Sequence, residues 1–391
     1  MSRSALQLVD SVPFTRKTLE VSFDSSQNED SHSLHYSLSF PDSFPAEIPS
    51  FFINKYSRRG DVVLDPFCGA GATALESAVL GRTPYASDAN PLAARVTQAK
   101  LEPADLTEVT LALQMLNLRR PIDLKIYNEF FSPFYDIDTF RELLHLREFV
   151  HSTDTPTAKF LELVALSLLH GHTAGYFSAY SLPQVALTPE KQKDLNNKRH
   201  QTPDYRAVMP RILRKTASIL RDGIPSVIRQ QSARSKVFAS DARDLSYIDS
   251  GTVNLIVTAP PLPGEPEFVQ DLWLKLWFSG IQSRSFADRL FSSSTVEGWK
   301  EYMNEVLLES ARVTRSGSRG VFVLRAARID NKSILLDEEL MNLVEENLSR
   351  YWEPESILVH HEKTAKLKDA QAERDQRKVH QRNRVLVLRR R

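Results

Sequence analysis

The sequence predicts an α/β fold in which a mostly parallel sheet is interrupted by a long helical insertion. Short apolar strands alternate with helices between residues 62 and 101, and strand patterns return from residue 236 onward. Residues 103–235 contain several helical patterns and no comparable strand. Because short buried strands that alternate with helices form parallel sheets with right-handed crossovers, both parts of the chain should contribute to one sheet.

The elements before the insertion begin with a loose arm at residues 1–43, which is rich in Ser, Asp and Asn. Short alternating pieces such as residues 33–38 predict an edge strand there at most. An amphipathic helix is expected within residues 44–56, and the apolar strand 62–64 ends at Asp65. A glycine turn then precedes a helix at 72–80, a strand at 83–87 that ends at Asp88, and a helix from Asn90-Pro91 to about residue 101.

The elements after the insertion resume the sheet. They are strands at 236–239, 253–257 and 320–324, a helix at 299–313, and a closing strand at 384–388. We therefore expect an arm (1–43), a first part of the α/β domain (44–102), the insertion (103–235) and a second part of the α/β domain (236–391).

Composition and charge are those of an ordinary globular protein. The 391 residues are 41% hydrophobic and 25% charged, and the formal net charge of +1 argues against a uniformly basic nucleic-acid coat. Cys68 is the only cysteine, which excludes an intramolecular disulfide and a cysteine-rich zinc site. The first residues lack the apolar core of a signal peptide, and no stretch approaches the roughly 20 apolar residues that span a bilayer. We expect a cytoplasmic protein with no membrane contact.

The strongest motif is VVLDPFCGAGAT at residues 62–73, where an apolar strand delivers Asp65 and then a Gly-X-Gly turn onto a helix. Glycines let the backbone approach a ligand more closely than any Cβ allows, and ligands of parallel sheets bind beyond the carboxyl ends of the strands. The helix N-terminus would favour a carboxylate there. A tight turn with no ligand would also explain Gly69 and Gly71.

Two further carboxylates favour the ligand. Asp88 follows the second strand about 20 residues past the glycines, where an acid can accept hydrogen bonds from ribose hydroxyls. Asp241 follows the strand at 236–239, from where it could reach an adenine amino group. Each acid alone is more often a helix cap or a loop residue, but three acids at the ends of successive strands are harder to explain that way.

The segments DPFCGAGAT, SDANPLA, SDARDL and VNLIVTAPPLP together resemble the family that methylates adenine N6 or cytosine N4 in DNA and, more broadly, base amino groups in RNA. The resemblance implies a Rossmann-like, seven-stranded methyltransferase sheet with an antiparallel last strand, and S-adenosylmethionine as the cofactor. It implies that the glycine turn surrounds the methionine part, that Asp88 holds the ribose and that Asp241 holds the adenine. FPAEIPSFF resembles the family's helix before the glycine loop. The expected cofactor residues are Phe44, Pro45, Asp65, Pro66, Phe67, Cys68, Gly69, Gly71, Asp88, Ala89, Asp241 and Ala242.

The expected catalytic segment is Thr258, Ala259, Pro260, Pro261 and Leu262, because a Pro-Pro pair stiffens the loop after the fourth strand. This segment departs from the family pattern, which has Asp, Asn or Ser before Pro-Pro and an aromatic residue after it. The polar side chain accepts hydrogen bonds from the target amine, and the aromatic ring stacks on a flipped base. Ala259 has no such acceptor, and Leu262 cannot stack as an aromatic ring would.

Three interpretations of this departure remain open. Backbone carbonyls could orient the amine while Phe268 or Trp273 supplies the stacking face. Glu265 or Glu267 could instead provide the missing acceptor. Alternatively, catalysis has been lost and cofactor binding retained. For all four side chains, ordinary loop and core roles are the simpler explanation.

Nucleic acid is the expected partner, with DNA preferred over RNA. Residues 188–236 contain 12 Lys and Arg against 4 Asp and Glu, and residues 363–391 contain 11 against 3. Phosphate contacts are a plausible use of such charge, although a solvated helical face explains it equally well. The candidate nucleic-acid residues are Lys198, Arg199, Arg211, Arg214 and Lys215. Cytosine N4 is the preferred target, because the DPFCGAG loop, the NPLA helix start and the long insertion look most like that branch of the family.

The segment HGHTAGYFSAYSLPQ, residues 170–184, mixes His, Tyr, Phe and small residues after an apolar helix. A base-contacting loop could have this composition, but a loop without chemistry is the simpler interpretation. Metal binding by His170 and His172 is not expected, because no further ligand stands nearby at a suitable spacing. We take the whole insertion as the candidate for target recognition.

Overall fold

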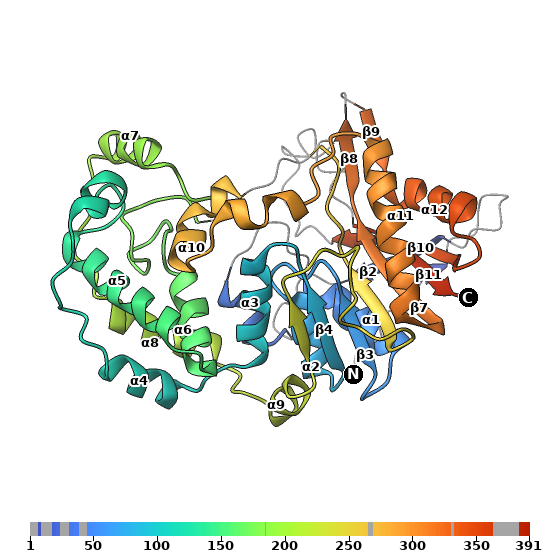
Figure 1. Cartoon of the computed structure of the whole chain (residues 1–391), viewed down its shortest axis with the longest axis horizontal. Coiled ribbons are helices and arrows are strands. Elements are labelled where there is room, and N and C mark those ends of the chain that lie inside the picture. Colours follow the sequence, from blue (N-terminus) through green and yellow to red (C-terminus); the bar gives the residue numbers. More distant parts are fainter. Residues whose placement is uncertain are drawn as a thin grey trace.

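The computed structural model describes residues 7–8, 18–23, 31–38, 45–183, 185–264, 269–329, 332–362 and 383–391. Helices pack on a central sheet, and most of the insertion forms a group of helices beside it (Figure 1). The α/β class predicted from the sequence is confirmed. No helix in these ranges is long and apolar enough to cross a membrane.

The central sheet has nine strands in the order β1-β2-β10-β11-β7-β6-β3-β4-β5. Seven of them belong to the predicted α/β part: β3 (Val62–Asp65), β4 (Thr83–Ser87), β5 (Lys236–Phe238), β6 (Val253–Thr258), β7 (Thr314–Leu324), β10 (Trp352–Glu362) and β11 (Arg384–Arg390). Strands β5, β4, β3, β6 and β7 pair in parallel, whereas β11 is antiparallel to both β7 and β10. The expected seven-stranded arrangement with an antiparallel last strand is therefore confirmed.

The arm adds to the edge of this sheet. Strand β2 (Thr18–Phe23) pairs in parallel with β10, and β1 (Gln7–Leu8) pairs with β2. The alternating piece at residues 33–38 is not a strand, because Ser33–Ser37 forms a 3-10 turn. This turn is tied to the insertion: the Ser33 hydroxyl donates to the carbonyl of Ile219 at 2.9 Å.

Helices cover both faces of the strands that carry the predicted motifs. Val63 packs with Ile48 and Phe52 on one face, and Leu64 packs with Trp299 on the other. Adjacent residues of a strand point to opposite faces, so a strand that is buried on both sides reads as an unbroken apolar run. The helices involved here and beside the glycine turn are α1 (Glu47–Tyr56), α2 (Ala72–Val79), α3 (Pro91–Leu101), α11 (Val296–Val313) and α12 (Leu336–Asn347).

The insertion contains α4 (Leu106–Gln114), α5 (Ile137–Ser152), α6 (Pro156–Leu166), α7 (Pro189–Arg199), α8 (Val208–Ile219) and α9 (Ser226–Ser232). Local signals start several of them: Asp105 forms a capping box at α4, and Thr155 caps α6 just before a proline. The insertion shares a hydrophobic core with α3 through residues such as Val96 and Phe160. A short helix from the second α/β part, α10 (Trp273–Phe278), joins the same core through Phe278.

Some elements were not predicted from the sequence. Strand β10 was missed, and so was the hairpin of β8 (Ala326–Ile329) and β9 (Lys332–Leu335) that follows β7. Strand β7 begins at Thr314, six residues before the predicted start at residue 320. Pro354 lies inside β10, where the register with β11 shifts between Pro354 and Ser356. A proline argues against a strand in the sequence pattern, and this irregularity accommodates it.

Candidate active site

The glycine turn joins β3 to α2 and is anchored on the neighbouring strand. The backbone N–H of Cys68 donates to the carbonyl of Ser87 at 2.9 Å, at the end of β4. Gly71 has φ +77°, and a Cβ there would lie 2.7 Å from Oγ1 of Thr97. Gly69 has φ +47°, and a Cβ there would meet no atom within 4 Å. Gly71 is therefore required by packing against α3, whereas Gly69 leaves open space in the turn.

Asp65 ends β3 as a buried carboxylate, 1% exposed. Its Oδ1 accepts from the Thr258 hydroxyl at 2.6 Å and from the backbone N–H of Phe67 at 3.1 Å. Its Oδ2 is buried and has no hydrogen-bond partner, since the nearby Thr73 hydroxyl, which also lowers the Asp65 pKa, donates to the carbonyl of Val257 at 3.1 Å. Burial raises the pKa of Asp65 to about 7, against the opposing effect of these hydrogen bonds. An oxygen left in this state favours a cationic donor that is not part of the chain.

Asp88 directly follows β4 and closes the turn from the other side. Its Oδ2 accepts from the backbone N–H of Gly69 at 2.9 Å, and its Oδ1 accepts from that of Asn90 at 2.9 Å. Burial raises the pKa of Asp88 to about 6. A carboxylate offers about four lone-pair sites, so Asp88 retains capacity for ribose hydroxyls while it shapes the turn.

Asp241 follows β5, as the sequence predicts, but its carboxylate has a partner that the sequence did not indicate. It lies next to the end of β4, where the N–H of Asp88 donates to the carbonyl of Phe238 at 3.2 Å. Its carboxylate is held by Arg243, whose Nη2 donates to Oδ2 at 2.8 Å and whose Nε donates to Oδ1 at 3.1 Å. The Arg243 guanidinium also lies 5.1 Å from the ring centroid of Tyr302. An adenine amine would have to share the carboxylate with Arg243.

Arg243 was not identified as a site residue from the sequence. The only signal for it in the sequence is its position two residues after Asp241.

The other residues expected to bind the cofactor differ in how far they are buried. Pro66 and Cys68 are buried and Ala242 is 1% exposed, whereas Phe67 and Ala89 are half-buried and Pro45 is exposed. Phe44 lies outside the described residues. Burial raises the pKa of the Cys68 thiol, so this cysteine stays protonated.

These residues fit the nucleoside cofactor that the sequence motifs imply. The unpartnered Oδ2 of Asp65 suits the ammonium of a methionine moiety, and the open space at Gly69 admits a chain past the turn. Asp65 ends β3 and Asp88 directly follows the adjacent β4, as a ligand that lies across the carboxyl ends of the sheet requires.

The Pro-Pro loop begins one residue after the Thr258–Asp65 hydrogen bond and is fixed on its other side by α11. The indole Nε1 of Trp299 donates to the carbonyl of Pro261 at 2.8 Å. Leu262 is 9% exposed and belongs to the core cluster that contains Trp299. The loop is therefore anchored at Pro261, and its leucine faces the core instead of a base. Ala259 is half-buried and Pro260 is buried.

Of the side chains considered as substitutes for the missing catalytic groups, the structure describes Trp273. Trp273 lies 5.8 Å from Phe131 and 5.7 Å from Phe134, measured between ring centroids, and its Nε1 donates to the carbonyl of Leu187 at 2.9 Å. It therefore packs against the insertion. Residues 265–268, which include Glu265, Glu267 and Phe268, lie outside the described residues.

The five candidate nucleic-acid residues do not form one continuous track. Lys198 and Arg199 are exposed on α7, whereas the other three lie on α8, which Figure 1 places at the opposite end of the helical group. Arg211 donates to the carbonyls of Ala174 and Ala207, and Lys215 donates to that of Tyr36. Arg214 is exposed. The side chains of Arg211 and Lys215 thus have structural roles.

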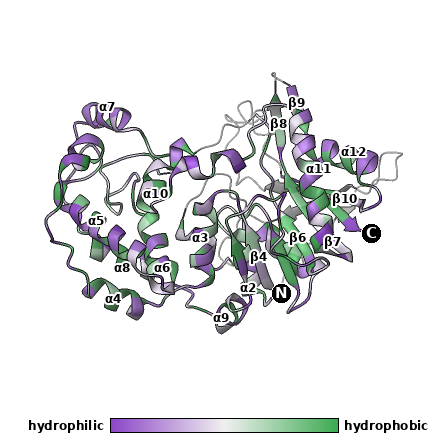
Figure 2. Ribbon diagram, in the orientation of Figure 1, coloured by the Kyte–Doolittle hydropathy of each residue, from purple (hydrophilic) through white to green (hydrophobic). Residues whose placement is uncertain are grey.

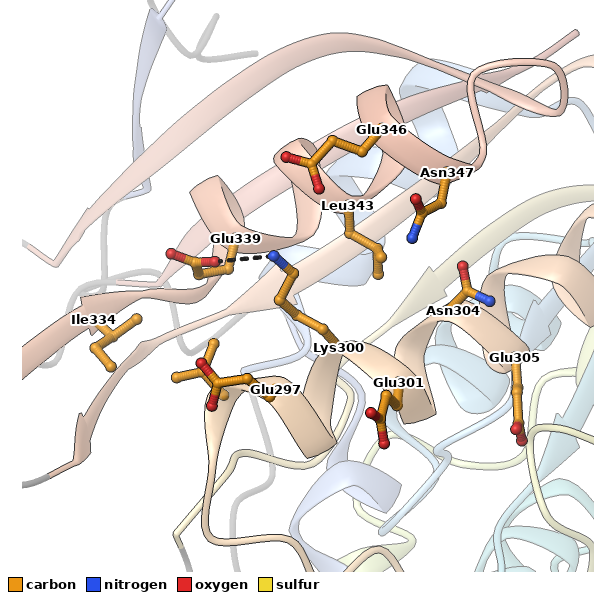
Figure 3. A pocket seen from close by; sticks show the side chains of 11 residues that line it. Glu297, Lys300, Glu301, Asn304, Glu305, Ile334, Glu339, Leu343, Glu346 and Asn347 are labelled. Carbon is orange, nitrogen blue, oxygen red and sulfur yellow. Dashed lines mark ion pairs between the residues drawn. The ribbon is translucent and has the colours of Figure 1, made fainter.

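The groove between α11 and α12, about 700 Å³ in volume, is an unsuitable place for a phosphate backbone (Figure 3). Five carboxylates line it, and its single lysine, Lys300, is paired with Glu339 at 3.6 Å. The carboxylates are those of Glu297, Glu301, Glu305, Glu339 and Glu346. Like charges repel, so nucleic acid should approach another surface.

Both ring nitrogens of His170 lie at hydrogen-bond distance from groups of the chain itself. Its Nε2 lies 2.9 Å from Nζ of Lys275, and its Nδ1 lies 2.7 Å from the carbonyl of Leu182. Burial lowers the pKa of His170 to about 3 and that of Lys275 to about 8. No group of three or more metal-ligating side chains occurs among the residues placed by the structure.

Part of the chain that forms this site matches a known protein family. Residues 14–99, which contain α1, the glycine turn and Asp88, match the profile of a family described as DNA methylase. This part of the chain is therefore similar to the DNA amino-methyltransferases of the N4/N6 type. S-adenosylmethionine is the methyl donor of this family, and the geometry of Asp65 and the glycine turn accommodates it.

Individual relatives are distant. The chain is 21% identical over 369 residues to the type II methyltransferase M.BsoBI of Geobacillus stearothermophilus, and the match covers 87% of this chain and 68% of that protein. The rRNA methyltransferase aviRa of Streptomyces viridochromogenes matches with a TM-score of 0.35, 11% identity and coverage of 94% of this chain and 92% of that one. An rRNA methylase of Streptococcus thermophilus matches with a TM-score of 0.31, 8% identity and coverage of 89% and 97%. At these scores the two structures say nothing about the substrate.

Proposed function

We propose that this chain transfers a methyl group from S-adenosylmethionine to an exocyclic amine of a DNA base, with cytosine N4 preferred over adenine N6. The observation that carries the proposal is the buried Oδ2 of Asp65, which has no partner and lies beside the glycine turn. The same carboxylate is hydrogen-bonded to Thr258, one residue before the Pro-Pro loop. The DNA methylase match supports DNA as the substrate, and the loop and insertion pattern supports cytosine.

In the proposed reaction, Asp65 would accept a hydrogen bond from the ammonium of the methionine moiety, and Asp88 would accept hydrogen bonds from the ribose hydroxyls. S-adenosylmethionine would supply the methyl group: its S–C bond would break as the lone pair of the target amine forms the new N–C bond, and the amine would release one proton to water. Because Ala259 has no polar side chain, carbonyl oxygens of the Pro-Pro loop orient the amine. Trp299 holds that loop still, so the geometry is set before the base arrives.

The proposal is tested with tritiated S-adenosylmethionine, duplex DNA of mixed sequence and the full chain, followed by nucleoside analysis. Label in N4-methylcytosine is the expected result, and the Asp65→Asn variant should lose it. Label in N6-methyladenine alone would correct the choice of base. Label in RNA and not in DNA would replace the substrate, and no label in either would refute catalysis.

A catalytically impaired nucleic-acid-binding protein is the second candidate, and the burial of Leu262 together with Ala259 favours it. The test is Ala259→Ser, which restores an acceptor of the family pattern. If transfer rises from undetectable to measurable, the chain is a decayed enzyme. If the wild type already transfers methyl groups, this candidate is wrong. Leu262→Tyr is the less useful variant, because a larger ring must displace core packing.

We further propose that the protein works in the cytoplasm and protects DNA sites within a restriction–modification pair. The similarity to a type II methyltransferase supports this setting. Sequencing of modified bases in cells with and without the gene would test it, because a protected site should lose its mark only in the second case.

A further inference from the structure

A buried arginine, Arg206, donates hydrogen bonds to the backbone of a loop of the insertion, residues 171–180. Arg206 is 9% exposed, and its Nη1 donates to the carbonyls of Thr173 at 3.3 Å, Tyr176 at 3.2 Å and Ser178. Arg211 adds a bond from its Nε to the carbonyl of Ala174 at 3.2 Å. Burying a guanidinium is costly unless its donors are satisfied; here Nη1 donates to the backbone of this loop, and Nε donates to Oδ1 of Asp204 at 2.9 Å. The loop is therefore held in a single shape.

The outer side of this loop carries rings. His172 is exposed and Tyr176 is half-buried, and their ring centroids lie 6.0 Å apart. Gly171 makes room for the Tyr176 ring, because a Cβ there would lie 2.4 Å from it. The rings thus sit on a backbone that is fixed before any partner arrives, which lowers the entropy cost of binding.

Helix α7 continues the same surface. The Arg199 guanidinium lies 3.7 Å from the ring centroid of Tyr180, and the carbonyl of Tyr180 accepts from Nε2 of Gln192 on α7 at 2.9 Å. Lys198 is exposed next to Arg199. Figure 2 shows α7 as hydrophilic nearly throughout, as its sequence PEKQKDLNNKR requires. A polar helix at this position offers charge to a partner and no apolar face.

The insertion is also bonded to the segment just before α10. The backbone N–H of Ala186, which follows the loop 171–180, donates to the carbonyl of Asp271 at 2.8 Å. Asp271 lies in the segment that follows the Pro-Pro loop in the chain. In Figure 1, α7 and the β8–β9 hairpin, which follows the carboxyl end of β7, rise on the same side of the molecule. Both belong to the side where the strand ends hold the candidate active site.

We propose that residues 171–180 and the C-terminal end of α7 form a preorganised contact surface for the nucleic-acid target, with His172 and Tyr176 stacking on a base. Arg199, set in place by Tyr180, contacts a phosphate together with Lys198. The inference rests on the proposed function and names the part of the insertion that reads the target. Rings on a rigid loop beside cations are the means by which proteins hold unpaired bases and their backbone.

The test compares two arginines that lie on tyrosine rings in different parts of the molecule. Arg350 lies 4.6 Å from the ring centroid of Tyr351, between α12 and β10 at the amino ends of the strands. Arg199→Gln and Arg350→Gln therefore remove the same charge from the same kind of contact. Fluorescence anisotropy measures the affinity of each variant for a labelled duplex across a salt series.

Arg199→Gln is expected to weaken duplex binding by about fivefold and to reduce the slope of log affinity against log salt by about one unit. Arg350→Gln should change neither quantity. On a single-stranded oligonucleotide, His172→Ala should weaken binding by about fivefold or more, because a stacked base is lost. Equal effects of the two arginine variants, or unchanged binding by both Arg199→Gln and His172→Ala, would overturn the inference.

A further measurement distinguishes failure of the contact surface from failure of the proposed methyltransferase function. Calorimetry with S-adenosylhomocysteine should give the same affinity for wild type, Arg199→Gln and His172→Ala, because none of these side chains belongs to the candidate cofactor site. If the wild type binds and methylates DNA while both variants bind DNA as tightly, the contact surface is wrong and the activity stands. If the wild type binds neither DNA nor RNA, both proposals fail together.

Discussion

Replacing Asp65 by asparagine should remove most of the pH dependence of cofactor affinity. Binding a methionine ammonium requires the ionised carboxylate, and burial raises the pKa of Asp65 to about 7. The ionised fraction of such a group increases about tenfold between pH 6 and pH 8, so affinity should rise by about the same factor. Asp88, with a pKa of about 6, adds only about twofold over this range. The Asp65→Asn variant should therefore bind weakly and show a rise of about twofold.

The assay is calorimetric titration with S-adenosylhomocysteine at pH 6, 7 and 8, in buffers of different ionisation enthalpy that report proton release. Wild type should release a proton at pH 6 and little at pH 8. Asp88→Asn is the matched control, because it removes an equally placed carboxylate and should leave the rise of about tenfold intact. An affinity of wild type that is flat across this range, or an Asp65→Asn variant that keeps the full rise, would refute the assigned role.

The raised pKa of Asp65 also predicts that the stability of the ligand-free protein changes with pH. Stability should fall as the pH rises, whereas cofactor affinity should increase. The folded state holds its proton up to a pKa of about 7, whereas the unfolded chain loses it near the ordinary value of 3.8. Ionisation between these values therefore lowers the free energy of unfolding as the pH rises, by an amount on the order of 4 kcal/mol. Chemical denaturation should show this loss for wild type and a smaller one for Asp65→Asn.

Three further predictions concern the stability of the fold. Gly71→Ala should lower the free energy of unfolding by about 2–5 kcal/mol, because its Cβ meets Thr97 and its φ is positive, whereas Gly69→Ala should cost only about 1–2 kcal/mol; equal losses in urea denaturation would contradict this. Burial lowers the pKa of Lys275 to about 8, so wild type should gain stability from pH 8 to pH 10, and Lys275→Met should be more stable at pH 7 and flat over that range; a variant that still gains with pH would exclude Lys275 as the cause. Arg206→Met should cost about 2–4 kcal/mol and speed amide exchange in residues 171–180, and unchanged exchange there would show that the arginine does not clamp the loop.

The sheet around the active site could be predicted from the sequence because its strands are short, apolar and bounded by glycine, proline or aspartate. The predicted strand at residues 83–87 agrees with β4 at both ends. The predicted helix from Asn90-Pro91 to about residue 101 likewise agrees with α3, whose Asn90 caps it through the N–H of Leu92. Local signals and burial act together at these places, so the pattern is unambiguous.

Long-range contacts explain what could not be predicted. Nothing near Asp241 in a linear pattern shows that Arg243 will turn back on its carboxylate, since a loop acid and a loop arginine have many possible partners. The burial of Leu262 depends on Trp299, which lies on another element. The charge count of residues 188–236 treated α7 and α8 as one surface, and the fold separates them. Of the basic residues counted there, Arg206 is buried and donates hydrogen bonds to the backbone of the loop 171–180.

A crystal structure of the chain with S-adenosylhomocysteine tests the central claim most directly. The account predicts that the ligand's amino nitrogen lies about 3 Å from Oδ2 of Asp65 and that its ribose hydroxyls reach Asp88. A ligand seated elsewhere, or an amino group that leaves that buried oxygen without a partner, would contradict it.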